Sequence, residues 1–139
     1  KDNPVFYVQY AYARCHSIKR MIAAQLPAAI DYRNKEGNSL IELIRSEDEL
    51  MLIKMMARWP RVIEASAVAG EPHRVVYYLQ ELSSYFHALW NKGREENDLR
   101  FVQFNDERLT AARLLLVEAV ATVIASGLSL FNITPQEAM

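Results

Sequence analysis

The sequence predicts an all-α protein, a bundle of about five or six helices that forms a single domain over residues 1–139. Three observations lead to this fold. Apolar residues recur at steps of three and four along most of the chain, which is the spacing of one helix face. Proline and glycine stand near the ends of these stretches, where helices begin and stop. No stretch alternates between apolar and polar residues for long enough to build a sheet.

Composition narrows the class of protein further. Of the 139 residues, 51% are hydrophobic and 24% are charged, enough for a core without disulfides or metals. No run approaches the ~20 apolar residues of a membrane span, so we expect no membrane partner. The single cysteine, Cys15, lies on an apolar stripe, and we expect a buried thiol and a cytoplasmic protein. The net charge of −1 argues against coating of nucleic acid, and we expect no DNA partner.

The first helix is expected from Pro4 to Gln25. Asn3 can cap it with its side-chain oxygen, and Pro4 suits the first helical position, where the missing N–H costs nothing. Proline at position 27 should stop the helix. The apolar face is formed by Val8, Ala11, Cys15, Ile18 and Ile22. A second stripe beside it carries Tyr7, Tyr10, Arg14 and Ser17.

Residues 27–38 are rich in turn formers and charges, and we expect them to form a connection. A short helical turn should follow over residues 39–44. The next helix begins after Ser46, which forms a capping box with Glu49 three residues later. The buried face expected for this helix consists of Leu50, Ile53 and Ala57, with Met51, Met55 and Met56 beside it.

A further helix is expected from Pro60 to Ala69, closed by Gly70 in a left-handed conformation. The long helix from Pro72 to about Asn91 follows. Its core positions are Val75, Val76, Leu79, Leu82, Phe86 and Leu89. Phe86 and Trp90 are four residues apart and should present two rings on one face.

Residues 91–98 read as a polar loop, and residues 99–104 as a short extended piece laid on the helices. Asn105 or Asp106 should cap the last long helix. One side of this helix is expected to be lined by Leu109, Ala112, Leu116, Ala119 and Val123.

Two interpretations of the tyrosine stripe remain open from the pattern alone. Two phenol rings and a guanidinium on one face, from Tyr7, Tyr10 and Arg14, can stack on nucleobases and hold phosphate. Alternatively, the tyrosines pack at the rim of the core with their hydroxyls in water, which is the commoner role of aromatic stripes.

No catalytic constellation is present. The histidines His16, His73 and His87 are far apart and have no metal-ligand spacing, so no metal site is expected. The chain has no phosphate-binding glycine loop and no nucleophile motif. We therefore expect no catalytic residue and no cofactor in this chain.

Several segments, taken in order, resemble the C-terminal anticodon-binding domain of bacterial arginyl-tRNA synthetases, class I enzymes. They are Pro4–Arg14 with Ser17-Ile18, Glu71–Arg74, Tyr78-Leu79 with Glu81-Leu82, Phe86-His87 with Trp90-Asn91, Ala112–Leu114, Ala119-Val120, Gly127-Leu128 and Pro135 with Met139. This helical domain is named after Asp-Ala-Leu-Arg, to which residues 110–113 are a poor match. Tyr12 replaces the usual histidine, and residues 130–133 depart from the usual Leu-Leu-Gly-Ile.

The resemblance implies that the parent enzyme is an arginine–tRNA ligase that uses ATP, with Mg, and arginine in protein synthesis. Its His-Ile-Gly-His and Lys-Met-Ser-Lys type signatures are absent here. We therefore expect a fragment that lacks an N-terminal catalytic domain and is inactive alone. Its expected partners are the anticodon stem-loop of tRNA(Arg) and that catalytic domain.

The resemblance also implies a set of residues that hold the splayed anticodon bases. By position these are Tyr7, Tyr10, Arg14, Phe86, Trp90 and Met139, with Lys19 and Arg20 as candidates for phosphate contacts. The alternative function is a helical protein-interaction domain without RNA binding, suggested by the methionine-rich helix.

Overall fold

Six α-helices and two short 3-10 helices make up residues 3–139, the part of the chain that this computed structural model describes. They are α1 (Pro4–Gln25), α2 (Pro27–Glu36), η1 (Gly37–Leu43), α3 (Glu47–Ala57), α4 (Trp59–Ala69), α5 (His73–Glu95), η2 (Asn97–Leu99) and α6 (Glu107–Ser129). No strand occurs within this range. The prediction of an all-α bundle is confirmed.

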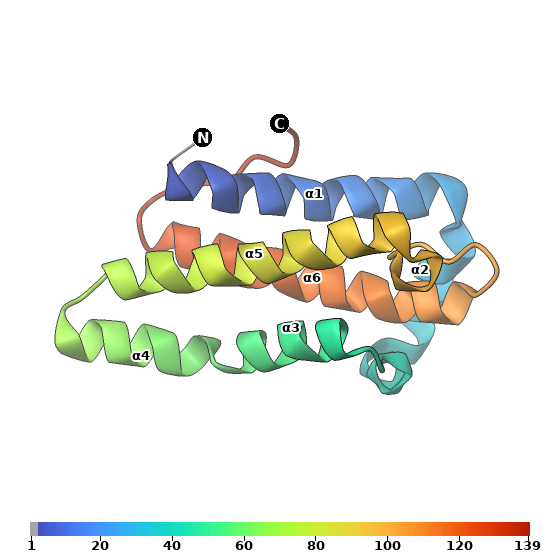
Figure 1. Cartoon of the computed structure of the whole chain (residues 1–139), viewed down its shortest axis with the longest axis horizontal. Helices are drawn as coiled ribbons and strands as arrows, with labels where there is room; N and C mark the ends of the chain where they lie inside the picture. The colour runs from blue at the N-terminus through green and yellow to red at the C-terminus, as the bar shows by residue number, and fades with distance from the viewer. Residues whose placement is uncertain (1–2) are drawn as a thin grey trace.

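α6 is the central helix of the bundle. It packs against α1 and α2, while α3 and α4 follow one another along the far side of α5 (Figure 1). Residues on several faces of α6 are therefore buried. Ala112 and Leu116 are buried as expected, and Val117 and Ile124 are buried on other faces. By length and composition α6 would also pass as a membrane span, which corrects our expectation for the sequence. Its burial against the other helices is that of a core helix.

α1 has the bounds that its sequence predicts. The Asn3 side chain accepts a hydrogen bond from the backbone N–H of Val5 at 2.9 Å. The expected apolar face, Val8 through Ile22, is buried. Cys15 belongs to this face and is fully buried, and burial raises the pKa of its thiol. The apolar stripe thus fixes α1 to the bundle, and the tyrosines of the stripe beside it stay at the surface.

The expected connection over residues 27–38 is wrong, because most of it forms α2. Pro27 occupies the first turn, where its missing N–H is tolerated. The charged side chains stay at the surface while Ala29 is buried, so they do not oppose a helix. Gly37, with a φ of 57°, ends it.

α3 begins at the expected cap but buries a different face. The Ser46 hydroxyl accepts a hydrogen bond from the backbone N–H of Glu49 at 3.2 Å. The buried residues are Glu49, Leu52 and Met55, whereas Leu50 is 41% exposed. Since Met55 points into the core, the methionines do not form one exposed groove.

A buried ion pair determines which face of α3 turns inward. Arg113 of α6 donates from Nε to Glu49 Oε2 at 2.9 Å and from Nη2 to Oε1 at 3.1 Å. The side chains are only 6% and 2% exposed. Nη1 of Arg113 also donates to the carbonyl of Arg100 at 2.7 Å. One guanidinium therefore joins α3, α6 and the segment before α6.

α5 is longer than the sequence predicts, because residues 91–95 continue the helix that we expected to end in a polar loop. Of its expected core positions only Val76 is half-buried rather than buried. Gly70 before it adopts the expected left-handed conformation, with a φ of 65°. Within the last turn, a Cβ on Gly93 would lie 3.1 Å from Arg100 Cα, so glycine permits the close approach of the next segment.

Residues 99–104 lie on the helices as expected, with Phe101 and Val102 buried. Thr110 Oγ1 accepts from the backbone N–H of Gln103 at 2.8 Å and donates to its carbonyl. The Gln103 side chain donates to the carbonyl of Arg100 at 3.0 Å. This segment is therefore held by side-chain hydrogen bonds as well as by apolar packing.

Asp106 caps α6, since its carboxylate accepts from the backbone N–H of Leu109 at 3.0 Å. We expect Asp106→Ala to lower the free energy of unfolding by about 1 kcal/mol, because one helix N–H loses its partner. Urea unfolding followed by circular dichroism measures this difference. Asn105→Ala is the matched control, and an equal loss in the two variants would contradict the capping role.

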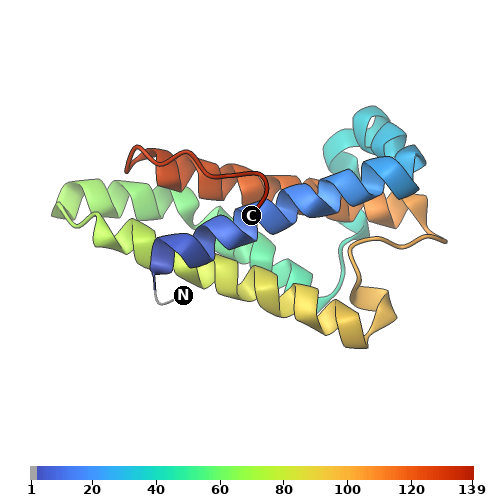
Figure 2. The ribbon, with the colours of Figure 1, turned by 90° about the horizontal axis from the view of Figure 1, so that it is seen from above.

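After α6 the chain turns back and runs along α1, which brings the C-terminus against this helix (Figures 1 and 2). Asn132, with a φ of 58°, makes the reversal. Asparagine tolerates this left-handed region better than most residues, and it stands where the resemblance leads one to expect glycine. Arg20 fastens the returning segment by donating from Nη1 to the carbonyl of Glu137 at 3.2 Å.

Candidate nucleic-acid interface

A surface pocket of about 260 Å³ forms where α1, α5 and the returning C-terminal segment meet. It is lined by Tyr10, Ala13, Arg14, Ser17, Arg20, Trp90, Ala138 and Met139. Segments from three distant parts of the sequence thus bring Tyr10, Arg14, Arg20, Trp90 and Met139 together. We call it the Arg14 pocket.

Arg14 lies between two aromatic rings of this pocket. Its guanidinium carbon is 4.9 Å from the centroid of the Trp90 ring and 5.6 Å from that of Tyr10. These are cation–π distances. Nη1 of Arg14 also donates to Nδ1 of His87 at 2.9 Å. Because arginine has five N–H donors, this arrangement fixes the guanidinium and leaves donors for an anion.

Tyr7 and Tyr10 lean on the His87 ring, with centroid distances of 5.0 Å and 6.0 Å. Tyr10 is 48% exposed and presents its ring to the pocket, while Tyr7 is 37% exposed and lies outside it. Of the two tyrosines, Tyr10 therefore lines the pocket, whereas Tyr7 packs against His87 outside it.

Trp90 stacks on Phe101, with an interplanar angle of 19° and a centroid distance of 6.4 Å. Phe86 lies behind Phe101 at 5.6 Å and is fully buried. The expectation that Phe86 presents its ring beside Trp90 is thus wrong, because Phe86 belongs to the core stripe of α5. Because its ring is buried, Phe86 cannot stack on a base. It packs against Phe101 instead, and Phe101 in turn supports Trp90.

The two candidate phosphate contacts are placed differently. Lys19 turns away from the Arg14 pocket, and its amine lies 3.8 Å from a carboxylate oxygen of Glu118, which also pairs with Arg33. Arg20 lines the Arg14 pocket and the neighbouring groove, with one donor on Glu137. Only Arg20 of this pair contributes to the pocket.

His87 is the site residue that sequence reasoning missed. It stands next to Phe86 on α5 and is 8% exposed, yet it reaches Arg14 across the helix interface. Burial and the nearby positive charge of Arg14 lower the pKa of His87 to about 4. The imidazole is therefore neutral at pH 7 and accepts the hydrogen bond that orients Arg14. Nothing in the spacing of the sequence indicates this contact.

The lowered pKa of His87 makes stability depend on pH. The folded-state pKa of about 4 is below the ordinary value of 6.5, so the stabilisation is complete above pH 6.5 and is lost as pH falls toward 4. Between pH 7 and pH 5 we expect a loss of about 2 kcal/mol from this group. Urea unfolding of the parent chain and of His87→Gln measures it. The same pH slope in both proteins would contradict the assignment.

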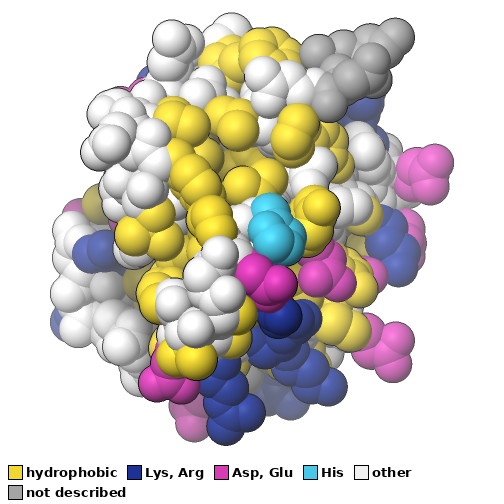
Figure 3. All heavy atoms as spheres, turned by 90° about the vertical axis from the view of Figure 1, so that its left-hand side faces the viewer, with side chains coloured by type: hydrophobic (Ala, Val, Ile, Leu, Met, Phe, Trp, Pro, Cys, Tyr) yellow, Lys and Arg dark blue, Asp and Glu magenta, His cyan; other side chains and the backbone are white. Residues whose placement is uncertain are grey.

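A larger cleft of about 570 Å³ between α4 and α5 also contains arginines: Arg58, Arg61 and Arg74. Arg58 lies 3.9 Å from Glu81, and Arg74 pairs with Glu71. At the end of the bundle that shows the α4–α5 turn, Lys and Arg side chains gather in the lower middle of the view with Asp and Glu side chains directly beside them (Figure 3). This cleft is therefore less suited to a phosphate backbone than the Arg14 pocket.

Residues 8–139 match the family model described as the DALR anticodon binding domain. The chain is 48% identical over 139 residues to an arginine–tRNA ligase of Wolbachia pipientis wMel. This match covers 100% of the chain and 23% of that ligase. It is 48% identical over 132 residues to the arginine–tRNA ligase of Brucella abortus (strain 2308), and this match covers 95% of the chain and 22% of that ligase. The chain thus spans about a quarter of the length of these relatives.

Among solved structures, a putative arginyl-tRNA synthetase from Campylobacter jejuni has a similar fold. The TM-score is 0.74 at 23% sequence identity, and the match covers 99% of this chain and 27% of that chain. The similarity extends over the whole helical bundle.

Proposed function

Because the chain belongs to the DALR anticodon-binding domain family, we propose that it binds the anticodon stem-loop of tRNA(Arg) as one domain of an arginine–tRNA ligase. The observation that carries this proposal is the Arg14 pocket. It combines two aromatic faces, a guanidinium fixed between them and a flexible methionine in one exposed site.

This combination suits the unpaired bases of an RNA loop. Single-stranded RNA is commonly bound by stacking its bases on aromatic side chains while cations hold its backbone. Tyr10, which is 48% exposed, supplies an aromatic ring, and Arg14 supplies a planar guanidinium held over Trp90. Met139, which is 51% exposed, can adapt to the outer side of a base. Arg14 and Arg20 supply positive charge at the same place, although the whole chain carries a net charge of −1.

Arginine activation and transfer are proposed for the rest of such a ligase rather than for this chain. ATP, Mg²⁺ and arginine would bind there, in the cytoplasm, and this chain would dock the tRNA. Within residues 3–139 no group of three His, Cys, Asp or Glu side chains is arranged to hold a metal ion. Because the His-Ile-Gly-His and Lys-Met-Ser-Lys type signatures are absent from its sequence, we expect no aminoacylation by the chain alone, measured with radioactive arginine and tRNA(Arg).

Titration of the chain with a fluorescent tRNA(Arg) anticodon stem-loop tests RNA binding. We expect Tyr10→Ala to weaken binding about tenfold, because a lost base stack is worth about 1–3 kcal/mol. The control is Tyr77→Ala, which removes an exposed tyrosine that lines the α4–α5 cleft instead. A parent chain without measurable binding would overturn the proposal, and an equal effect of both variants would overturn the assigned surface.

A further inference from the structure

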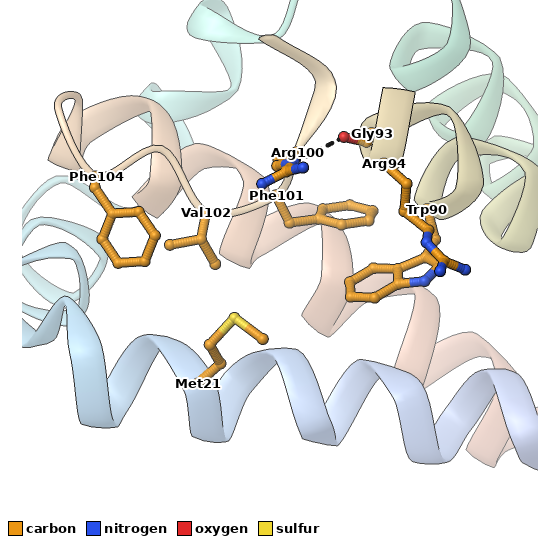
Figure 4. Close-up of a pocket in the computed structure, with 8 residues that line it drawn as sticks. All are labelled: Met21, Trp90, Gly93, Arg94, Arg100, Phe101, Val102 and Phe104. Atoms are coloured by element: carbon orange, nitrogen blue, oxygen red, sulfur yellow. Dashed lines mark hydrogen bonds between the residues drawn. The ribbon is translucent and has the colours of Figure 1, made fainter. Parts of the chain in front are cut away.

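A second pocket, also of about 260 Å³, shares Trp90 with the Arg14 pocket (Figure 4). Trp90 and Phe101 form one wall, Phe104 with Val102 forms the opposite one, and Met21 rises from α1 between them. We call it the Phe104 pocket. Within residues 3–139 Trp90 alone lines both pockets, so the two adjoin at its indole.

The lining of the Phe104 pocket is apolar and aromatic, with two cations at its edge. Phe104 is 60% exposed, so its ring is accessible to a ligand in this pocket. The volume exceeds that of an apolar cavity of about 150 Å³, which accepts benzene. The pocket therefore has room and flat surfaces for a ring larger than benzene.

Arg94 and Arg100 give this pocket a charge that fits a phosphate. Both are exposed, and among residues 3–139 neither has a carboxylate within salt-bridge distance. Nε of Arg100 donates to the carbonyl of Gly93 at 2.9 Å, which orients its guanidinium at the top of the pocket (Figure 4). The remaining N–H groups are free to bind an anion.

The walls of the pocket are held in place without a ligand. The carbonyl of Arg100 accepts from Arg113 and from the Gln103 side chain, and the backbone of Gln103 is bonded to Thr110. Phe101 is buried between Trp90 and the core. A site that is ordered in advance loses little entropy when it binds.

From this arrangement we propose that the Phe104 pocket binds a second nucleobase, adjacent in the RNA to the base in the Arg14 pocket. Its phosphate lies between Arg94 and Arg100, and Trp90 separates the two bases. The proposal rests on the proposed function, since it extends the same RNA site by one nucleotide. A positively charged aromatic groove that follows a strand is typical of single-stranded nucleic-acid binding.

The experiment pairs protein variants with stem-loops that carry an abasic nucleotide at one loop position at a time. The dissociation constants of the parent chain, Phe104→Ala and Tyr10→Ala are measured by fluorescence anisotropy for each stem-loop. We expect Phe104→Ala to weaken binding of the intact loop about tenfold. One abasic position should then cost affinity in the parent chain and nothing further in Phe104→Ala, and Tyr10→Ala should respond at a neighbouring position.

Phe6→Ala is the matched control, because Phe6 is 48% exposed on α1 and lines neither pocket. If Phe104→Ala binds every stem-loop as the parent does while Tyr10→Ala is weakened, the second subsite is wrong and RNA binding stands. In that case the Phe104 pocket would not contact the stem-loop. If the parent chain binds no stem-loop, both proposals fall.

Discussion

Arg113→Ala is expected to lower the free energy of unfolding by about 3–5 kcal/mol, because it leaves the buried carboxylate of Glu49 without its cation, with only the Ser46 hydroxyl still donating to it. It also removes the donor to the carbonyl of Arg100. The loss is large compared with the total stability of a domain, about 5–15 kcal/mol. Urea unfolding of the parent chain and the variant, followed by circular dichroism at pH 7, measures it.

Arg108→Ala is the control for this prediction. Arg108 pairs with Glu36 at 2.6 Å, a shorter contact than the 2.9 Å between Arg113 and Glu49, but its side chain is 50% exposed. We expect a change below about 1 kcal/mol. Replacing both buried partners, in Glu49→Leu with Arg113→Met, should recover most of the stability lost in Arg113→Ala. Equal losses in Arg113→Ala and Arg108→Ala would show that burial does not determine the effect.

The starts of α1, α3 and α6 were predictable because their causes are local. The Asn3, Ser46 and Asp106 caps need only a side-chain oxygen beside free backbone N–H groups, and all three form. Which face of α3 turns toward the core was not predictable in this way. Glu49 is charged, so periodicity assigns it to the surface, and only the arginine 64 residues later makes its burial possible.

The site was predictable from the sequence only in part. Spacing along α1 puts Tyr10 and Arg14 on one face, and the structure places both in the Arg14 pocket. The same reasoning on α5 paired Phe86 with Trp90, although helix spacing cannot tell which of two rings faces the core. Trp90 and Met139 were joined to the stripe by family resemblance alone.

His87 could not be found from the sequence, because its role depends on the distance between α1 and α5 rather than on any motif. A neutral imidazole that accepts from Arg14 requires burial, which is a property of the folded bundle. The His87 contact and the two aromatic neighbours together make Arg14 the most constrained cation of the pocket.

Replacing this cation is expected to have the largest effect on RNA binding. We expect Arg14→Gln to weaken the binding of the anticodon stem-loop about 100-fold, since a charge-assisted contact and a cation–π partner are lost together. Arg14→Lys should bind about tenfold less tightly than the parent chain, because an ammonium restores the charge but not the planar fork. Anisotropy titrations at one fixed salt concentration measure both.

The salt dependence of binding separates a phosphate contact from a structural role of Arg14. If Arg14 binds one phosphate, log K falls less steeply with log salt in Arg14→Gln, by about 0.7 in slope, while Tyr10→Ala keeps the slope of the parent chain. Arg14→Lys, which keeps the charge, should also keep the slope. An unchanged slope in Arg14→Gln would assign its lost affinity to the displaced Tyr10 and Trp90 rings, and Arg14 would then be a positioning residue rather than a phosphate ligand.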